Sequence, residues 1–599
     1  MPVIRRAHKR SVLPRRLLPL AASLLPVLSV GAAETPARLL NLSVRSAAGT
    51  PIPGFVLAGE GTRPMLLRAV GPGLAPFGLT GFEPNPRLTL LSGSRTVGEN
   101  DDWRPADGPA MAAAGAFPLP AGSRDAALLT PLAAGAYTAP VNATGITLLE
   151  VYDAASAAAG PSLVNASTLA PVGTGAGVLI PGFVVGGTGK LRLLLRAIGP
   201  SLAGFGVTGT LANPTVTLYR GQQALATNDD WMAAANPGQV MAAAARVGAF
   251  PLEMESRDAV LLADLEAGAY TAVVSGVGGT SGQALFELYA VPPQPAVLPV
   301  GAWGLKADLL EPNSEMSVAE LGGRIYVFGG YPASRVSVRT VQIYDSRTDT
   351  WRVSTPLPVA LNHTVAAAVG NRVYVIGGQT GAGGAGPFVD TVYAFDPATE
   401  TWSTRAPMPT QRSGGGATVV DGKIYVAGGR PPRGNDFAVY DPATDRWQTL
   451  PDLPTQRNHL GVAAIDRRIY VTGGRFGAGF ESETTDIVEV FDVAAGTWSR
   501  RAPLPKTRGG VNSIVAHGYL HVFGGEGMRT GSGVFADHDV YDPVTDKWIS
   551  LPPMPVPVHG ATGAGFIDGL IHLAGGGIMD GGDNGTTLHQ VYRPATRYP

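Results

Sequence analysis

Three arginines stand at the same distance from three glycine pairs in the second half of the chain. Arg412, Arg457 and Arg508 each lie 16 residues before the first glycine of a pair. A guanidinium group presents a planar fork of donors that matches carboxylates, sulfates and phosphates. If the repeated segments form a ring, these side chains meet on one face and form a basic pocket for an anion such as an acidic sugar. The alternative is that the arginines hold neighbouring loops by donating to backbone carbonyls.

Other polar residues extend this candidate ligand-binding face. The same position before other glycine pairs holds Asn313 and His559, and positions one or two residues further on hold Asn362, Asn458, Glu315, His363 and His459. The loops after the pairs add Arg430, Arg433, Arg475, Arg529, Glu481, Glu483, Glu526, Asp580 and Asp583. Glu315 or a channel histidine would be the acid–base group of an enzyme, because proton transfer needs such a group within hydrogen-bond reach of the substrate. No carboxylate spacing near the histidines dictates a metal site, so we expect no metal and no cofactor here.

The glycine pairs mark a repeat that organises this half of the chain. They are Gly329-Gly330, Gly377-Gly378, Gly428-Gly429, Gly473-Gly474, Gly524-Gly525 and Gly575-Gly576, at intervals of 45 to 51 residues. Each pair ends an apolar β run, and the first five are followed by an aromatic-Asp step and then by Trp351, Trp402, Trp447, Trp498 or Trp548. A residue without Cβ turns the chain freely at the end of a strand, and flat aromatic groups suit packing between repeats.

Diglycine, Tyr/Phe-Asp and Trp in this order and period resemble kelch repeats. The resemblance covers half of the chain and implies a six-bladed β-propeller. The sixth pair has no following Trp, whereas Trp303 precedes the first pair. We therefore expect residues 302 to 308 to pair with the strand ending near Tyr592, which would close the ring and remove an exposed sheet edge.

Two groups of enzymes are similar to such a ring. Galactose oxidase needs a cysteine linked to a tyrosine for its copper radical site, and this chain has no cysteine. Sialic-acid mutarotases are six-bladed kelch rings of bacterial export compartments, but no motif of this chain selects them. A shared fold does not by itself transfer a function.

Residues 38 to 297 contain an internal duplication. Pro53-Gly54-Phe55 recurs as Pro181-Gly182-Phe183, and Asn100-Asp101-Asp102-Trp103 recurs as Asn228-Asp229-Asp230-Trp231. Each copy contains short apolar or alternating runs bounded by Gly, Pro, Asn or Asp, which predicts β-strands. We expect two tandem jelly-roll-like β-sandwiches, which resemble modules that bacteria append to secreted enzymes.

The repeated acidic residues of these copies have two interpretations. Asp101, Asp102, Asp229 and Asp230 offer the oxygen ligands that Ca²⁺ prefers. Asn and Asp side chains also bond their own backbone in turns. We favour the turn and keep calcium as the weaker alternative.

The remaining features concern export and stability. Six Lys and Arg residues precede an apolar segment from Leu17 to Val30, and the small residues Gly31 to Ala33 follow it. This order is typical of a signal peptide cleaved before Glu34. The chain has no cysteine, so its stability must come from packing and ring closure. Its net charge of −1 gives no indication of nucleic-acid binding.

Together these patterns predict an all-β secreted protein that is extracellular or periplasmic and has no membrane span after cleavage. We expect a signal peptide at 1–33, β-sandwich modules at 34–160 and 161–291, a proline-rich linker at 292–300 and a kelch propeller at 301–599. The leading hypothesis is a non-catalytic protein that binds a glycan or an extracellular protein on the propeller's loop face. The alternative is a mutarotase, isomerase or lyase that acts on an acidic sugar in the channel.

Overall fold

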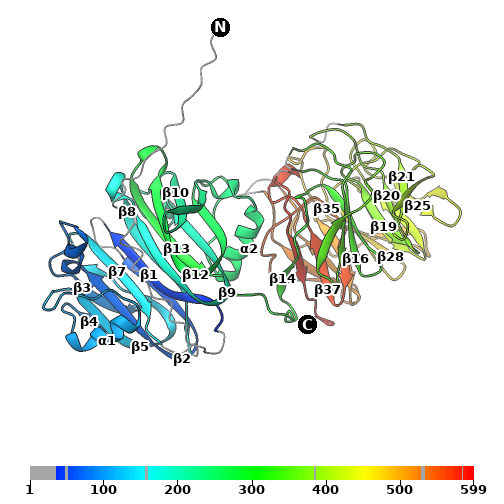
Figure 1. Ribbon diagram of the computed structural model, residues 1–599. Helices are drawn as coiled ribbons and strands as arrows, with labels where there is room; N and C mark the ends of the chain where they lie inside the picture. Colours follow the sequence, from blue (N-terminus) through cyan, green and yellow to red (C-terminus); the bar gives the residue numbers. More distant parts are fainter. Residues whose placement is uncertain are drawn as a thin grey trace, which may run out of the picture. The chain divides into compact units, whose positions relative to one another are not determined.

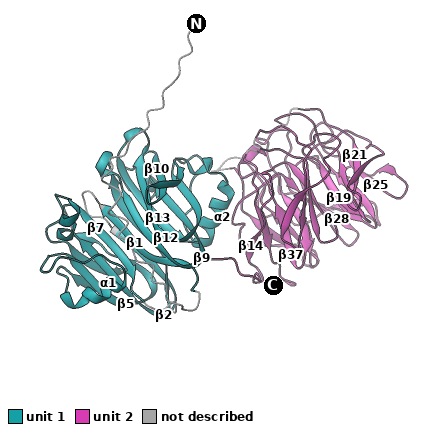
Figure 2. Cartoon of the chain, in the orientation of Figure 1, with its two compact units in different colours: residues 1–292 teal, residues 293–599 magenta. Residues whose placement is uncertain are grey.

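The computed structural model describes residues 35–46, 52–142, 144–155, 160–332, 334–383, 386–527, 533–582 and 584–599. The expected signal peptide lies outside these residues. The chain divides into two compact units, residues 1–292 and 293–599 (Figure 1, Figure 2). Both units are built mainly of strands, so the all-β prediction is confirmed. No helix among the described residues has the length and apolar character needed to cross a membrane.

The first unit contains both copies of the duplicated sequence. Its strands are β1 (Arg38–Ser46), β2 (Ile52–Val70), β3 (Arg87–Ser92), β4 (Arg95–Asn100), β5 (Ala126–Thr138), β6 (Val141–Asn142), β7 (Thr147–Asp153), β8 (Ser162–Val172), β9 (Ile180–Ile198), β10 (Pro214–Arg220), β11 (Gln223–Asn228), β12 (Ala259–Gly276) and β13 (Gly282–Ala290). The helices α1 (Gly108–Ala113) and α2 (Pro237–Val247) follow the two Asn-Asp-Asp-Trp motifs.

The first strand of each copy pairs both with a strand of its own copy, β1 with β7 and β8 with β13, and with a strand of the other copy. β1 of the first copy pairs with β9 of the second, with Leu42 opposite Phe183. β8 of the second copy pairs with β2 of the first, with Ala166 opposite Phe55. The described strands of this unit consequently form one 13-stranded sheet over a hydrophobic core shared by both copies. Two separate sandwich modules are not confirmed, and a boundary between residues 160 and 161 stays a prediction.

The second unit is a ring of six small sheets. Blade one contains β15 (Met316–Glu320), β16 (Arg324–Phe328), β17 (Val341–Asp345) and β18 (Thr350–Val353); blade two contains β19 (Val365–Val369), β20 (Arg372–Ile376), β21 (Val392–Asp396) and β22 (Thr401–Arg405); blade three contains β23 (Gly416–Val420), β24 (Lys423–Ala427), β25 (Phe437–Asp441) and β26 (Arg446–Thr449). Blade four contains β27 (Gly461–Ile465), β28 (Arg468–Thr472), β29 (Val488–Asp492) and β30 (Thr497–Arg500); blade five contains β31 (Asn512–Ala516), β32 (Tyr519–Phe523), β33 (His538–Asp542) and β34 (Lys547–Ser550). The six-bladed β-propeller is thereby confirmed.

The sixth blade is assembled from both ends of this unit. It contains β36 (Gly565–Ile567), β37 (Leu570–Ala574), β38 (His589–Tyr592) and, as its outer strand, β14 (Trp303–Lys306). Trp303 lies opposite Tyr592 in the β14–β38 pairing, so the predicted ring closure is confirmed. The short strand β35 (Ala561–Thr562) precedes β36 and pairs in parallel with β15 of blade one.

The repeated glycines and tryptophans join neighbouring blades. Gly329 and Gly330 have φ of 58° and 96°, and a Cβ on Gly329 would lie 2.2 Å from the carbonyl oxygen of Leu361 in the next blade. The Gly330 N–H donates to that same carbonyl at 2.8 Å. Trp303 reaches blade five in a similar way, because its Nε1–H donates to the Pro552 carbonyl at 3.0 Å. The same residue types therefore recur in each blade because they hold one blade to the next.

Candidate functional site

A ring of residues with left-handed backbone closes one end of the propeller channel. One such residue precedes the inner strand of each blade: Glu315, His363, Gly414, His459, Gly510 and Gly560, with φ between 51° and 68°. From His363 onward, each N–H donates to the carbonyl of the preceding member over 2.6 to 3.3 Å. Left-handed backbone costs a residue with a Cβ on the order of 1–3 kcal/mol, and active sites and ligand-binding positions are among the places where such residues cluster. The three members with side chains therefore mark a candidate site.

The three glycines of this ring provide the space that the other side chains fill. A Cβ on Gly414 would lie 2.9 Å from Cε1 of His459, and a Cβ on Gly560 would lie 2.9 Å from Cδ of Glu315. A Cβ on Gly510 would lie 3.4 Å from Nδ1 of His559. Glycine at three of six positions is thus what lets one carboxylate and the imidazoles converge on the axis.

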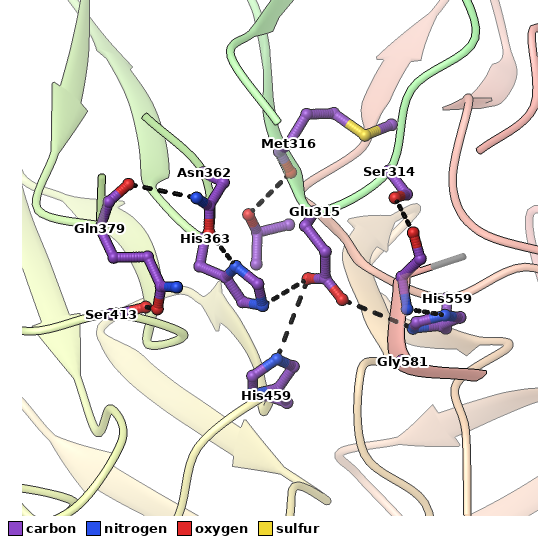
Figure 3. Close-up of polar contacts among 12 residues, drawn as sticks. Ser314, Glu315, Met316, Asn362, His363, Gln379, Ser413, His459, His559 and Gly581 are labelled. Carbon is purple, nitrogen blue, oxygen red and sulfur yellow. Dashed lines mark hydrogen bonds and ion pairs between the residues drawn. The ribbon is translucent and has the colours of Figure 1, made fainter. Parts of the chain in front are cut away.

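Glu315 lies at the centre of this convergence (Figure 3). Its Oε2 is 3.0 Å from Nε2 of His363 and 3.9 Å from Nε2 of His459, and its Oε1 is 3.9 Å from Nδ1 of His559. All four residues are buried, with exposed fractions of 5% or less. They come from blades one, two, four and six, so the site exists only in the closed ring.

Two arginines and a second glutamate surround these four residues. Arg430 donates to Nε2 of His363 at 2.9 Å and also to Gln379. Arg475 donates to Nε2 of His459 at 2.8 Å and forms a buried ion pair with Glu526. Glu526 in turn lies 3.5 Å from Nδ1 of His559 and accepts from the Gly581 N–H at 2.9 Å. We call Glu315, His363, His459, His559, Arg430, Arg475 and Glu526 the axial cluster.

Hydrogen bonds outside the cluster orient the imidazoles. Asn362 Nδ2 donates to Ser337 and Asn458 Nδ2 donates to the Gly477 carbonyl, which turns both amide oxygens toward Nδ1 of His363 and His459. Each Nδ1 consequently carries the proton, and each Nε2 presents a lone pair to the axis. The sequence places Asn362 and Asn458 next to the two histidines, but it does not show which ring nitrogen each amide contacts.

Burial and charge shift the titration of this cluster. Burial raises the pKa of Glu315, because a carboxylate is poorly solvated there. The pKa values of His363 and His459 fall well below the usual range, first because of burial and then because of the nearby arginines. The pKa of Glu526 is lowered: burial, the largest single effect, opposes this, but His559 and Arg475 together outweigh it. Both histidines are therefore neutral near pH 7.

The three arginines that stand 16 residues before a glycine pair lie outside this cluster. Arg412 donates to the carbonyls of Val426, Gly428 and Asp436. Arg457 pairs with Glu489 at 2.7 Å, and Arg508 pairs with Asp539 at 2.6 Å. All three guanidinium groups are buried within their own blades. These contacts correspond to the loop-holding alternative, and anion binding by these residues stays a prediction.

Two other predicted residues also take specific places. Asn313 is buried and donates to the Gly329 carbonyl at the end of blade one's second strand. The prediction that His559 is equivalent to Arg412 is wrong by one residue. The Arg412 carbonyl accepts from the Gly378 N–H, and in blade six it is the Val558 carbonyl that accepts from the equivalent Gly525 N–H. One additional residue lies between this position and the glycine pair in blade six, where Gly563 with φ of 104° interrupts the inner strand. That shift is what brings His559 into the axial cluster.

The space along the channel differs between its two parts. The inner strands enclose a cavity of about 330 Å³, lined by small residues such as Ala367, Val419 and Ala464. The cavity at the axial cluster measures only about 10 Å³. A single water needs about 10–15 Å³ of such space, so the cluster has no room for a sugar ring.

The Asn-Asp-Asp-Trp motifs of the first unit form turns that are held by their asparagine side chains. Asn100 donates to the Asp102 carbonyl at 2.9 Å and accepts from the Ala127 N–H at 2.8 Å. Asn228 makes the equivalent bonds to Asp230 and Val260. Among the described residues, Asp101, Asp102, Asp229 and Asp230 do not join any group of three possible metal ligands. These contacts favour the turn, and calcium binding stays the weaker prediction.

Comparison with known proteins identifies the repeat. A family described as the KLHDC2/KLHL20/DRC7 Kelch-repeats domain matches residues 304–453 and 405–576. Kelch-like protein terF of Aspergillus terreus is 32% identical over 306 residues, which is 47% of this chain and 65% of that protein. Kelch-like protein 25 of Xenopus tropicalis is 27% identical over 256 residues, or 42% of each chain.

A solved structure described as "Structure of YjhT" covers 48% of this chain and 96% of its own, with 16% identity and a TM-score of 0.41. The chain spans less than two thirds of the length of the two kelch-like relatives. The family match covers all six glycine pairs. Residues 304–576 are therefore kelch repeats, and with β14 and β38 they build the six-bladed propeller.

Proposed function

We propose that this protein is a secreted binding protein whose propeller engages another protein on the loop face. We define the loop face as the loops that follow the glycine pairs and those that enter the inner strands. The observation that carries the proposal is the small size of the cavity beside Glu315, His363 and His459 on this face, which measures about 10 Å³ among the residues that the structure describes. A ligand on this side therefore docks onto the loops. The kelch-like relatives support a protein-interaction role for the propeller.

The loops on this face are fastened to one another before any partner binds. The Ser337 N–H donates to the Gly381 carbonyl at 3.0 Å, and the Gly383 N–H donates to the Arg335 carbonyl at 2.9 Å. The Arg335 side chain also donates to the Gly581 carbonyl at 2.8 Å. Loops from blades one, two and six are thus ordered together, which lowers the entropic cost of forming an interface.

Substitution of one exposed valine tests this surface. Val336 lies on the loop face with 49% of its surface exposed, and Val353 lies on the outer strand β18 with 55% exposed. We expect Val336→Glu to abolish capture of a protein partner by the full-length chain, because a charge in an interface core is costly to desolvate. Val353→Glu is the matched control and should leave capture unchanged. The measurement is pull-down from cell envelope and culture medium, followed by affinity measurement with the purified partner.

Three results of this experiment would contradict the proposal. Equal affinity of the partner for both variants would show that the loop face is not part of the interface. Binding on a glycan array without any protein partner would make a glycan the ligand. Turnover of an acidic sugar would support the enzyme alternative, in which Glu315 and His363, 3.0 Å apart, form an acid–base pair after the cluster opens.

Secretion is a separate part of the proposal. It is supported by the basic residues Arg5 to Arg16, the apolar segment from Leu17 to Val30 and the small residues before Glu34. Mass spectrometry of the protein from culture medium or periplasm should find Glu34 as the first residue. Recovery of the uncleaved chain from the cytoplasm alone would contradict secretion.

A further inference from the structure

The axial cluster turns the lone pairs of several ring nitrogens toward one point, and two of them accept hydrogen bonds from arginine. Nε2 of His363 and Nε2 of His459 face the axis because their Nδ1 protons are held by Asn362 and Asn458. His559 has the opposite orientation: its Nε2 lies 2.7 Å from the Met579 carbonyl oxygen and 3.3 Å from the Gly582 nitrogen, and the shorter contact places the proton on Nε2. Its Nδ1 is fully buried and, among the described residues, accepts no hydrogen bond. Such orientation of each ring by a carbonyl is what metal-binding histidines need.

We propose that Glu315, His363, His459 and His559 form a binding site for one divalent transition-metal ion of the Zn²⁺ class. Glu315 and the first two histidines bring ligand atoms within 4.8 Å of one another. Ligands about 2 Å from an ion in a tetrahedron lie about 3.3 Å apart. The distances from the Glu315 oxygens to the three imidazole nitrogens are 3.0, 3.9 and 3.9 Å, so small side-chain movements complete the geometry.

The donor set selects the kind of metal. Three imidazole nitrogens and one carboxylate oxygen suit Zn²⁺, Co²⁺, Ni²⁺ or Cu²⁺, whereas Ca²⁺ and Mg²⁺ prefer sites made of oxygen. The cavity of about 10 Å³ leaves no room for a substrate beside the ion. The site is therefore closed and structural, and the ion would tie blades one, two, four and six together across the axis.

Two arginines compete with the ion for the same lone pairs. Arg430 and Arg475 donate to Nε2 of His363 and His459 at 2.9 and 2.8 Å. Each arginine has a second partner, Gln379 or Glu526, to which it stays bonded when the ion takes its place. This competition predicts that removing an arginine strengthens metal binding, a result that misfolding cannot produce.

The test uses the full-length chain after removal of metals with a chelator. Titration with Zn²⁺ should show that the wild-type chain binds one ion, and substitution of a cluster residue should abolish this binding. Co²⁺ bound to the wild-type chain should give the visible absorption of a four-coordinate site. His459→Asn keeps a residue that tolerates left-handed backbone and removes one ligand. We expect it to weaken binding by at least about a hundredfold, since loss of an outer-shell partner alone costs about 10–100-fold. Arg430→Gln should lower the dissociation constant below that of the wild-type chain.

His517→Asn is the matched control. His517 has the same left-handed backbone as His459, with φ of 52° against 53°, but is exposed and lies outside the cluster. It should bind Zn²⁺ as the wild-type chain does. Absence of Zn²⁺ and Co²⁺ binding by the wild-type chain would overturn the proposal. So would equal binding by the His459→Asn and His517→Asn variants, or weaker binding by Arg430→Gln.

Discussion

At the scale of single residues, this propeller buries an unusual number of polar side chains. Six buried histidines have lowered pKa values, chiefly because of burial: His363, His459, His521, His538, His572 and His589. The pKa of His521 falls to about 3 and that of His572 to about 4. His521 and His538 also contact one another, with ring nitrogens 3.0 Å apart. The folded chain therefore holds these imidazoles neutral.

This burial makes stability depend on pH. An unfolded histidine titrates near pH 6.5, so the stabilisation from neutral burial is present above that pH and is lost as the pH falls toward the folded pKa. We expect the urea midpoint of the full chain to fall from pH 7 to pH 5. Burial raises the pKa of Glu315, which has the opposite effect on stability, but the effect of this one carboxyl is smaller than that of the six imidazoles together. The double variant His521→Tyr/His538→Val, which gives blade five the side chains of Tyr470 and Val488 in blade four, should show a smaller fall. Equal midpoints at both pH values would contradict this account.

The buried arginines allow a second test at this scale. Arg457 pairs with Glu489 at 2.7 Å and donates to the Thr455 and Gly473 carbonyls, with both charged side chains at most 1% exposed. Arg457→Ala leaves a buried carboxylate without its partner and should destabilise the propeller by about 3–5 kcal/mol. Arg500→Ala is the control, because Arg500 approaches the same Glu489 but is 71% exposed, and exposed pairs contribute about 0–1 kcal/mol. A stable Arg457→Ala variant that loses ligand binding would instead support the basic-pocket hypothesis.

At the scale of elements, the propeller depends on one short strand far from its partner in sequence. β14 pairs with β38 and completes blade six, which would otherwise present an unpaired edge. Trp303 packs edge-on against Phe523 and His538 of blade five, with ring centroids 5.8 and 5.5 Å apart. This strand therefore joins the first residues of the propeller to its last two blades.

Removal of the Trp303 side chain tests this closure. Trp303→Ala should destabilise the propeller by about 3 kcal/mol, at the lower end of the range for buried Trp, because Trp303 is only partly buried. Deletion of residues 298–309 should destabilise it further. Val300→Ala changes an exposed residue of the same segment and should have little effect. Chemical denaturation followed by tryptophan fluorescence and circular dichroism measures all three. An unchanged midpoint for Trp303→Ala would show that closure contributes little.

At the scale of the whole molecule, the two units use repetition differently. In the propeller each repeat contacts its neighbours in chain order, and only blade six joins both ends. In the first unit the first strand of each copy also pairs with the other copy, through the β1–β9 and β8–β2 pairings. The duplicated copies are therefore interdependent, and their shared core contains Leu42 and Phe183 from different copies.

This interdependence predicts how fragments behave. Residues 35–292 should fold and unfold cooperatively, whereas residues 35–160 and 161–292, each produced alone, should not, because β2 would lose its pairing with β8 and β9 its pairing with β1. Mixing the two halves should restore cooperative unfolding. Circular dichroism and calorimetry measure this. Cooperative unfolding of either half alone would instead support two tandem modules.

Much of the propeller could be predicted from the sequence because each blade repeats the same local requirements. The glycine pairs, the aromatic-Asp steps and the tryptophans recur in order, and the displaced Trp303 is enough to predict closure. The polar residues of the axial cluster could be named for the same reason, since they stand at fixed distances from Gly329 and its equivalents.

Only the tertiary structure decided which residues meet. Pairing between the copies of the first unit leaves no mark in the sequence, because β1 pairs with β7 of its own copy and with β9 of the other over much the same residues. Arg412, Arg457 and Arg508 stand at the same position before a glycine pair as Asn313. Their guanidinium groups nevertheless donate to partners within their own blades. The convergence of Glu315, His363, His459 and His559 depends on left-handed backbone, on three glycines that leave space and on a one-residue shift in blade six. These are properties of the closed ring, which no single repeat contains.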